Sequence, residues 1–266
     1  MLLADGHVHS EWSWDAGQAD GDHAGSMFGT CERAAELGVG SIAFTDHLDF
    51  TPWEVELEEL DGLDSFKVYV TGSTLTPPPL DVDGYLESIE RCRTAFPELR
   101  ILTGIEFGEP HRNADAAATF LERGRFERIN GSLHSLQVGD LFNEPHGLFK
   151  IWPAADVIRA YLDELSRMIA NSDFHVLSHI QYPLRYWPND EEPFEARAFE
   201  KEFRRALRLL ADRGRALEIN TRDALLPEIL RWWREEGGTA LTYGSDAHSP
   251  AVLARGIREA LAGIEG

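Results

Sequence analysis

Two histidines one residue apart, His7 and His9, follow a short apolar run that begins at Leu2-Leu3. Residues i and i+2 of a strand point to the same side, so both imidazoles can bind one metal ion. A comparable pair, Asp246 and His248, follows another apolar run near the opposite end of the sequence. A fold that brings the first and last strands side by side places these four side chains together. Closed barrels of strands and helices have this property.

Seven strand-like runs, each followed by a helical pattern, fill most of the 266 residues. Such alternation indicates parallel strands in one α/β domain, predicted to span residues 1–266. After the first run, the predicted strands are Ser41–Thr45, Arg100–Ile105, Arg128–Leu133, Phe174–Ser178, Ala216–Ile219 and Thr239–Gly244. The predicted helices are Ser26–Leu37, Asp81–Phe96, Ala114–Arg123, Pro153–Ala170, Pro193–Asp212, Leu225–Glu235 and Ala251–Ala262.

Six of the seven predicted strands deliver a histidine or an acid at or just beyond their carboxyl end. In strand–helix barrels this end carries the chemistry. A single histidine at a strand end is ordinarily a hydrogen-bonded residue of the core or the surface, but a whole series of them predicts a common site. The series is His7, His9, His47, Glu106, His134, His179, Asp246 and His248, to which the loop residue Asp15 is added.

These nine side chains supply six imidazoles and three carboxylates, which is more than one ion can use. Two or three divalent ions are therefore expected, with Glu106 as the natural bridge because a carboxylate has two oxygens. Zinc, manganese and iron all suit such a shell of nitrogen and oxygen atoms. Paired ions ~3.5–4 Å apart clamp the attacking and leaving oxygens of a displacement and lower the pKa of a bound water to about 7. This chemistry suits phosphate ester hydrolysis.

The combined series closely resembles the polymerase and histidinol phosphatase (PHP) family. It consists of His7-Val8-His9 with Asp15, Thr45-Asp46-His47, Gly104-Ile105-Glu106, Gly131–His134, Ser178-His179 and Gly244–His248, in order along the whole chain. The His-x-His-Ser opening and the long insertion at 48–80 resemble the stand-alone histidinol-phosphate phosphatases. The resemblance implies a distorted seven-stranded (β/α)7 TIM-like barrel with a trinuclear metal site. It also implies a phosphomonoesterase of histidine biosynthesis in which a metal-bridging hydroxide attacks L-histidinol phosphate.

The same resemblance implies how the ligands divide among the ions. The first ion is assigned to His7, His9, Glu106 and Asp246, the second to Glu106, His134 and His179, and the third to Asp15, His47 and His248. Glu106, Asp246 and His248 are the implied catalytic residues. Some family members have histidine where this chain has Asp15, so the third site departs most from the family pattern.

Three further residues are candidates for substrate contact. Arg185 follows the His179 motif and Arg222 follows Asn220, and a guanidinium fork suits phosphate, although each could equally form a surface ion pair. His111, in the loop after Glu106, is a candidate contact or proton donor. Four aromatic residues on the same loops either line a pocket or pack the loops: Trp12, Trp14, Tyr186 and Trp187.

The composition narrows the classes of partner. The chain is 43% hydrophobic and 27% charged, which supports a sizeable core. A formal charge of −21 disfavours nucleic acid as a partner, and the family resemblance implies a small phosphorylated substrate instead. Two cysteines, Cys31 and Cys92, form no disulfide framework, and no apolar run reaches the ~18 residues needed to cross a bilayer. A cytoplasmic protein without a membrane partner is expected.

Three other functions compete with the phosphomonoesterase. A phosphodiesterase or nucleotide phosphoesterase of the same family is the nearest, and the acidic charge weighs against a polynucleotide substrate. Amidohydrolase-like C–N cleavage also uses His-x-His but often needs a bridging lysine, and Lys67, Lys150 and Lys201 all lie away from strand ends. A metal-storing or regulatory domain would bind metal without turnover. The sequence leaves open the leaving alcohol, the general acid, the native metals and the oligomeric state.

Overall fold

A computed structural model of the chain describes residues 3–16, 25–60 and 64–265. Its centre is a sheet of seven strands, in which every neighbouring pair is parallel. In spatial order, which is also chain order, these are β1 (Leu3–Val8), β2 (Val39–Leu48), β6 (Arg100–Gly108), β7 (Arg128–Ser132), β10 (Val176–Leu177), β11 (Ala216–Asn220) and β12 (Leu241–Gly244).

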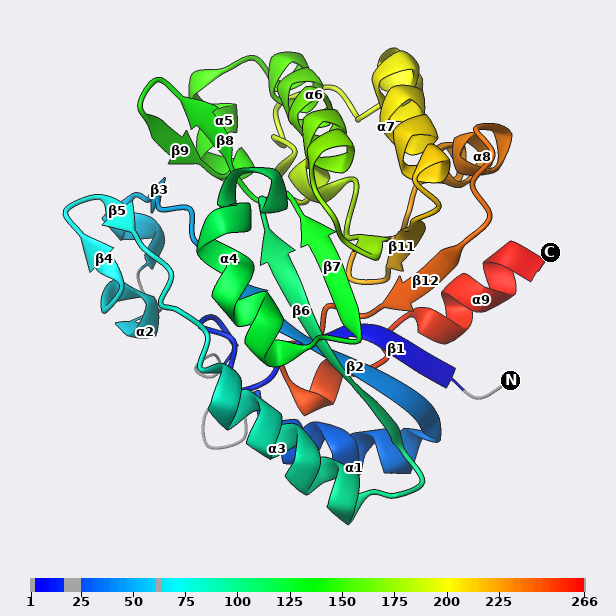
Figure 1. The fold of residues 1–266 in the computed structure, drawn as a ribbon. Coiled ribbons are helices and arrows are strands. Elements are labelled where there is room, and N and C mark those ends of the chain that lie inside the picture. Colours follow the sequence, from blue (N-terminus) through cyan, green and yellow to red (C-terminus); the bar gives the residue numbers. More distant parts are fainter. Residues whose placement is uncertain (1–2, 17–24, 61–63, 266) are drawn as a thin grey trace.

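The first and last strands meet, so the sheet curls into a nearly closed barrel (Figure 1). Beyond β12, the backbone of Ala247 accepts a hydrogen bond from the His9 N–H at 2.8 Å, and the Asp246 N–H donates to the carbonyl of His7 at 2.9 Å. The buried carboxylate of Asp5 accepts hydrogen bonds from Ser245 and from the Ala254 N–H. These contacts join residues some 240 positions apart in the sequence, and they confirm the predicted seven-stranded α/β barrel.

Helices cover the outside of the barrel (Figure 1). The larger ones are α1 (Met27–Leu37), α3 (Val82–Ala95), α4 (Pro110–Gly124), α5 (Pro145–Ile151), α6 (Ala154–Asn171), α7 (Glu200–Asp212), α8 (Pro227–Glu235) and α9 (Ile257–Glu265). The ends of α1 show why the sequence folds locally in this way. The Ser26 hydroxyl caps its start by accepting from the Gly29 N–H, and Gly38 ends it with a left-handed φ of 68°. No helix in the described part of the chain is long and apolar enough to cross a membrane.

Two predicted helices begin later than expected. The Pro193–Asp212 prediction resolves into a 3₁₀ turn, η3 (Ala196–Phe199), followed by α7. The Ala251–Ala262 prediction resolves into a second 3₁₀ turn, η4 (Pro250–Val252), and α9 begins only at Ile257. Ala254 and Gly256 have positive φ angles of 55° and 74°, which an α-helix cannot contain. The close contact of Ala254 with Asp5 explains this break.

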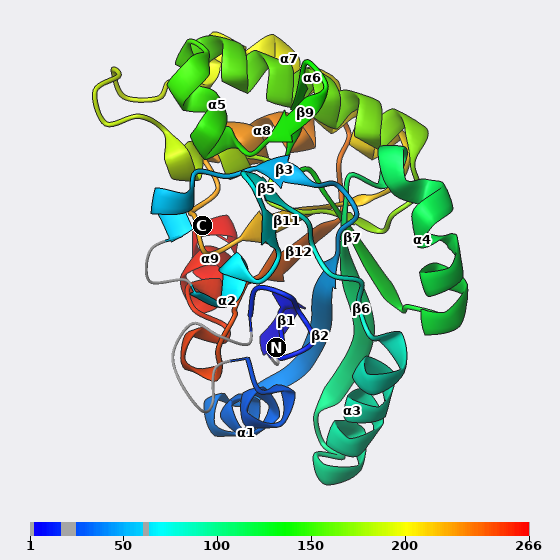
Figure 2. The same cartoon turned by 90° about the vertical axis from the view of Figure 1, so that its left-hand side faces the viewer.

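The segment at 48–80, predicted to be an irregular lid or insertion, has its own small fold. Strands β3 (Trp53–Glu54), β5 (Thr74–Leu75) and β4 (Val70–Thr71) form an antiparallel sheet, with η1 (Leu57–Leu60) and α2 (Asp64–Lys67) between β3 and β4. A hairpin of β8 (Leu136–Val138) and β9 (Leu141–Asn143) lies near β3. Figure 2 shows the insertion in front of the barrel strands. It therefore forms part of the wall around the carboxyl ends of the strands.

Candidate metal centre and active-site cleft

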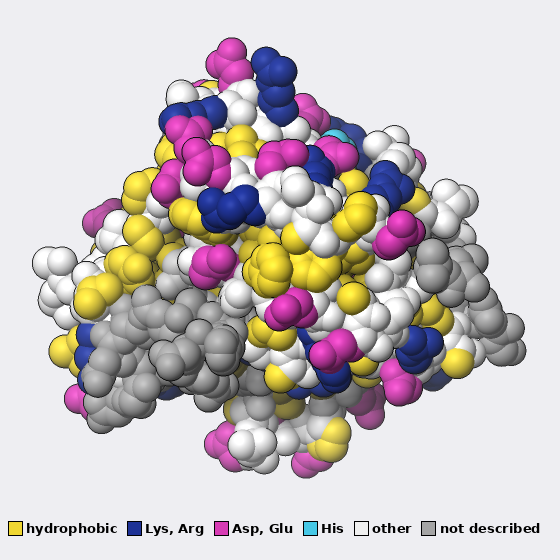
Figure 3. Space-filling model, turned by 90° about the horizontal axis from the view of Figure 1, so that it is seen from below, with side chains coloured by type: hydrophobic (Ala, Val, Ile, Leu, Met, Phe, Trp, Pro, Cys, Tyr) yellow, Lys and Arg dark blue, Asp and Glu magenta, His cyan; other side chains and the backbone are white. Residues whose placement is uncertain are grey.

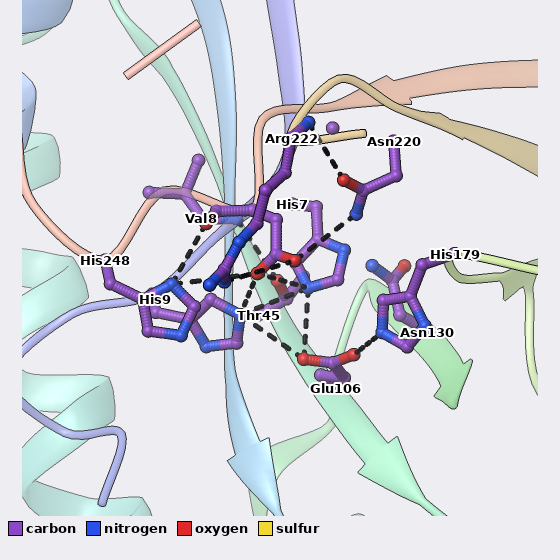
Figure 4. Close-up of polar contacts among 12 residues, drawn as sticks. His7, Val8, His9, Thr45, Glu106, Asn130, His179, Asn220, Arg222 and His248 are labelled. Carbon is purple, nitrogen blue, oxygen red and sulfur yellow. Dashed lines mark hydrogen bonds and ion pairs between the residues drawn. The ribbon is translucent and has the colours of Figure 1, made fainter. Parts of the chain in front are cut away.

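All nine predicted ligand side chains converge at the carboxyl ends of the barrel strands. His7, His47 and Glu106 lie within β1, β2 and β6, Asp15 lies in the loop after β1, and the others lie one to four residues beyond a strand end. Figure 4 shows Glu106 between the histidines of β1 and His179. The polar residues at these strand ends are largely buried: His7 and His9 have no exposed surface and Glu106 has 1%.

Glu106 occupies the centre of the cluster. Its Oε2 atom lies 3.1 Å from Nε2 of His7 and 3.3 Å from Nε2 of His9. Its Oε1 atom lies 2.7 Å from Nε2 of His179 and 3.3 Å from Nε2 of His134, and it also accepts a hydrogen bond from the hydroxyl of Ser132 at 2.6 Å. One carboxylate thus has a different pair of imidazoles at each oxygen, as a bridging ligand requires.

The remaining predicted ligands lie on either side of this centre. Asp246 Oδ1 is 3.5 Å from Nε2 of His9. Asp15 Oδ2 is 2.9 Å from Nε2 of His248 and 3.3 Å from Nε2 of His47. The candidate ligand atoms form three groups, and within each group all of these atoms lie within 4.8 Å of one another. The groups are His7 with His9 and Asp246; His47 with Glu106 and His134; and His9 with Asp15, His47 and His248.

This donor set fits divalent cations. The Nε2 atoms of His7 and His9 face each other at 3.1 Å, and Glu106 Oε2 faces both. When these nitrogens are unprotonated, their lone pairs and the carboxylate oxygen repel one another unless a positive charge lies between them. The buried Oδ1 atom of Asp15 has no hydrogen-bond partner in the described part of the chain. Buried polar atoms are costly without partners, so the cluster is arranged to bind cations.

The electrostatics of the cluster without a cation agree with this. Burial by itself would lower the pKa of His7, but the carboxylates of Glu218 and Glu106 raise that pKa well above its ordinary value. Burial would raise the pKa of Glu106, yet the neighbouring imidazoles, His7 first, hold it well below the ordinary range. Asp246 behaves similarly, with His9 as the largest opposing influence. The carboxylates are therefore ionised and demand positive charge.

Glu218 was not among the predicted site residues, although it contacts two of them, His7 and His179. Its Oε1 atom lies 2.7 Å from Nδ1 of His7, while its Oε2 accepts from the His179 N–H at 3.0 Å and from Asn220 at 3.1 Å. A side chain at Gly244 would place its Cβ 2.4 Å from Glu218 Oε1, so the glycine leaves room for the carboxylate. The available signal was a lone acid inside the apolar strand β11.

Asp49 and Ser13 contact the Nδ1 atoms of other predicted ligand histidines. Asp49 Oδ2 is 3.1 Å from Nδ1 of His47, and Oδ1 is 3.8 Å from Nδ1 of His134. Asp49 also accepts a hydrogen bond from the indole of Trp14 at 3.0 Å. The Ser13 hydroxyl lies 2.9 Å from Nδ1 of His9 and accepts from the His47 N–H. Such outer partners orient a ligand imidazole and select its tautomer.

The cluster forms the floor of a cleft of about 710 Å³. Arg185 and Arg222, the two arginines proposed from the sequence as substrate contacts, both line it. Arg185 Nη2 donates to Asp246 Oδ2 at 2.8 Å and its Nε donates to Asp223, while Arg222 Nη1 lies 3.8 Å from the same oxygen of Asp246. Two guanidinium groups thus lie beside the candidate metal ligands.

Some predicted substrate contacts lie elsewhere. His111 is outside the cleft, and its Nε2 lies 2.8 Å from Glu164, so it joins α4 to α6. Trp14 and Tyr186 line the cleft. Trp12 packs in the apolar cluster beneath the first strands, and Trp187 packs against Phe149 and Phe194. For these two tryptophans the alternative of loop packing is correct.

The chain is similar to known proteins along most of its length. Residues 5–222 match the model of the PHP domain family. The histidinol-phosphatase of Lactococcus lactis is 25% identical over 260 residues, which cover 93% of this chain and 85% of that protein. A crystal structure of histidinol phosphate phosphatase from Lactococcus lactis, complexed with zinc, L-histidinol and phosphate, has a TM-score of 0.73 at 23% identity and covers 93% and 87% of the two chains. The hisK structure from Listeria monocytogenes has a TM-score of 0.69 at 19% identity and covers 96% and 99%. The chain belongs to the PHP domain family.

Proposed function

We propose that this protein is a metal-dependent phosphomonoesterase whose substrate is L-histidinol phosphate. The observation that carries the proposal is the position of Glu106 between four imidazoles at the floor of a cleft that also contains two arginines. Family membership and the named activity of the Lactococcus lactis relative support the same reaction.

The residues that would hold the metal ions are the nine converging side chains. His7, His9 and Asp246 would bind one ion, His134 and His179 a second and Asp15, His47 and His248 a third, with Glu106 between the first two. Zinc, manganese or iron would suit these donors. Bound divalent ions supply activation of water and neutralise the charge that develops on phosphoryl oxygens.

The arginines of this chain would bind and orient the phosphate. Arg185 is largely buried, with its guanidinium 5.1 Å from the ring centre of Tyr182, and Asp246 and Asp223 hold its orientation. Arg222 is 45% exposed and so can turn toward an arriving anion. A planar fork of N–H donors binds phosphate oxygens in pairs, which fixes the ester for attack.

A small monoester suits the protein better than a polynucleotide. On the face shown in Figure 3, the described Lys and Arg side chains lie among acidic ones and form no basic band. The formal charge of −21 would repel a polyanion. Among the described residues no lysine lines the cleft, which weighs against the carboxylated lysine of amidohydrolase-like enzymes.

The test is phosphate release from L-histidinol phosphate by protein loaded separately with zinc, manganese and iron. A nitrophenyl monoester and its diester, assayed in parallel, separate monoesterase from diesterase activity. We expect turnover of the monoesters and loss of at least about a hundredfold in the variant Asp246→Asn, because one carboxylate ligand becomes neutral. A metal-loaded protein that releases no phosphate from any monoester contradicts the proposal.

A further inference from the structure

Tyr182 connects the candidate metal centre to a carboxylate farther out in the cleft. Its ring centre lies 5.4 Å from that of His134 and 5.1 Å from that of His179. At the other end of the side chain, the Tyr182 hydroxyl donates to Glu144 Oε1 at 3.2 Å. The Tyr182 side chain therefore lies between the Glu144 carboxylate and the imidazoles of His134 and His179. An ester whose phosphate lies at the imidazoles can extend its alcohol along this side chain toward the carboxylate.

Glu144 lines the cleft directly before α5, and its side chain is 19% exposed. Besides the Tyr182 hydroxyl, the His146 ring is nearby, with Nδ1 3.6 Å from Glu144 Oε2. Burial raises the pKa of the Glu144 carboxyl. Neither of these two partners is a lysine or an arginine. A cationic group that entered the cleft would give the Glu144 carboxylate a partner with a permanent positive charge.

The insertion at 48–80 contributes an apolar wall to the same cleft. Trp53, Val55, Leu60, Phe66 and Leu75 line the same cleft with apolar and aromatic surface. Trp14 packs against this group, with its ring 5.6 Å from Trp53 and 5.5 Å from Phe66. Aromatic faces and a carboxylate that line the same cleft are a typical environment for a small organic cation.

We propose that Glu144, with the hydroxyls of Tyr182 and Tyr186, binds a cationic group on the leaving alcohol of the substrate. The preferred substrates are then phosphate monoesters of small amino alcohols. This inference rests on the proposed function, because it concerns the alcohol half of the same ester. A neutral alcohol would leave the partly buried Glu144 carboxylate with only the Tyr182 hydroxyl and the His146 ring as partners, and sites built to pair a charge reject analogues that lack it.

The experiment compares Glu144→Gln with Glu56→Gln on two substrates and one inhibitor. Gln keeps the shape of Glu144 and removes its charge. Glu56 is an exposed carboxylate on the neighbouring insertion that pairs with Lys150 outside this cleft, so it is the matched control. The substrates are L-histidinol phosphate and glycerol phosphate, whose alcohol is neutral. The inhibitor is L-histidinol, with inorganic phosphate as its comparison.

For Glu144→Gln we expect the KM of L-histidinol phosphate to rise at least about tenfold, with little change in kcat. Inhibition by L-histidinol should weaken by a similar factor. Inhibition by phosphate and the kinetics of glycerol phosphate should stay unchanged, and Glu56→Gln should match the unmodified protein throughout. The variant Glu144→Asp keeps the charge and should retain part of the preference for L-histidinol phosphate over glycerol phosphate. It replaces Glu144→Gln in the assays if the Gln variant is too unstable.

Two results would overturn the inference. One is an unchanged KM and an unchanged L-histidinol inhibition in Glu144→Gln. The other is an equal fall in kcat on both substrates, which would assign Glu144 to proton transfer or to folding instead. If the unmodified protein releases no phosphate from any ester, the proposed function fails by itself. Calorimetric titration of L-histidinol into metal-loaded protein then decides: weaker binding to Glu144→Gln supports the cation site, and equal binding contradicts it.

Discussion

The Oε1 atom of Glu218 lies 2.7 Å from Nδ1 of His7, and both side chains are fully shielded from solvent. Glu218 comes from β11 and His7 from β1, which lie 211 positions apart in the sequence. The contact turns Nε2 of His7 toward Glu106 and makes the imidazole a stronger ligand. Glu218 also accepts from the His179 N–H, so one buried carboxylate orients residues from two parts of the metal cluster.

Glu218→Gln is therefore expected to weaken metal binding by about 10–100-fold. The amide keeps the size of the carboxylate but loses its charge, and either its NH₂ group or its oxygen must face His7. The measurement is metal content after dialysis against graded chelator, with activity as a second readout. Glu87→Gln, at an exposed position on α3, is the control. Equal metal retention by both variants would show that Glu218 has no part in positioning His7.

Gly244→Ala tests the same contact from the other side. A Cβ at this position would lie 2.4 Å from Glu218 Oε1 and 2.4 Å from the Cβ of His7, closer than such atoms approach. The two side chains must therefore separate, and we expect loss of metal similar to that in Glu218→Gln with a lower melting temperature. Gly263→Ala, where an added Cβ meets nothing within 4 Å, is the comparison. A Gly244→Ala protein with full metal content would contradict the arrangement.

Asp49→Asn should loosen the two imidazoles that Asp49 contacts, those of His47 and His134. The amide oxygen can still accept from the Trp14 indole, so this variant separates the effect on the imidazoles from the effect on the aromatic wall. We expect metal affinity to fall about 10–100-fold while the fluorescence of the tryptophans stays close to that of the unmodified protein. A changed fluorescence with intact metal binding would assign Asp49 to the wall alone.

Glu164 predicts a pH dependence of stability that is separate from the metal centre. The hydrogen bond from His111, together with Arg112, outweighs burial and lowers the pKa of Glu164 to about 2. Because the folded pKa is depressed, this stabilisation is present above the unfolded pKa near 4.5 and is lost as the pH falls toward 2. Glu164 is partly exposed, and allowing for solvent screening the stabilisation is about 1 kcal/mol.

The measurement for Glu164 is urea unfolding of Glu164→Gln beside the unmodified protein. At pH 7 the variant should unfold with about 1 kcal/mol less free energy. The gap should narrow as the pH is lowered from 4.5. Glu122→Gln, on the exposed side of α4, should show no gap at either pH. A gap for Glu164→Gln that stays constant across this range would mean that packing, and not charge, causes the loss.

The sequence by itself determined the barrel and the convergence of its ligands. Alternating strand and helix patterns require parallel strands, and parallel strands of one barrel present their carboxyl ends at the same rim. The histidines and acids at six of the seven strand ends, from His7 to His248, must therefore lie near one another. The hydrophobic periodicity of each segment and the order of the segments along the chain can be read directly from a sequence.

The tertiary structure alone decided which residues support the predicted ligands and which line the cleft. Glu218, Asp49 and Glu144 carry no local pattern, because their partners come from other strands and loops. The late start of α9 likewise depends on the contact of Ala254 with Asp5, which lies 249 positions away. His111 was predicted to lie in a loop and contact substrate, but it lies in the first turn of α4, and the packing of α4 on α6 places it beside Glu164. Contacts between distant segments form only when the barrel closes, since hydrogen bonding and burial act through space and not along the chain.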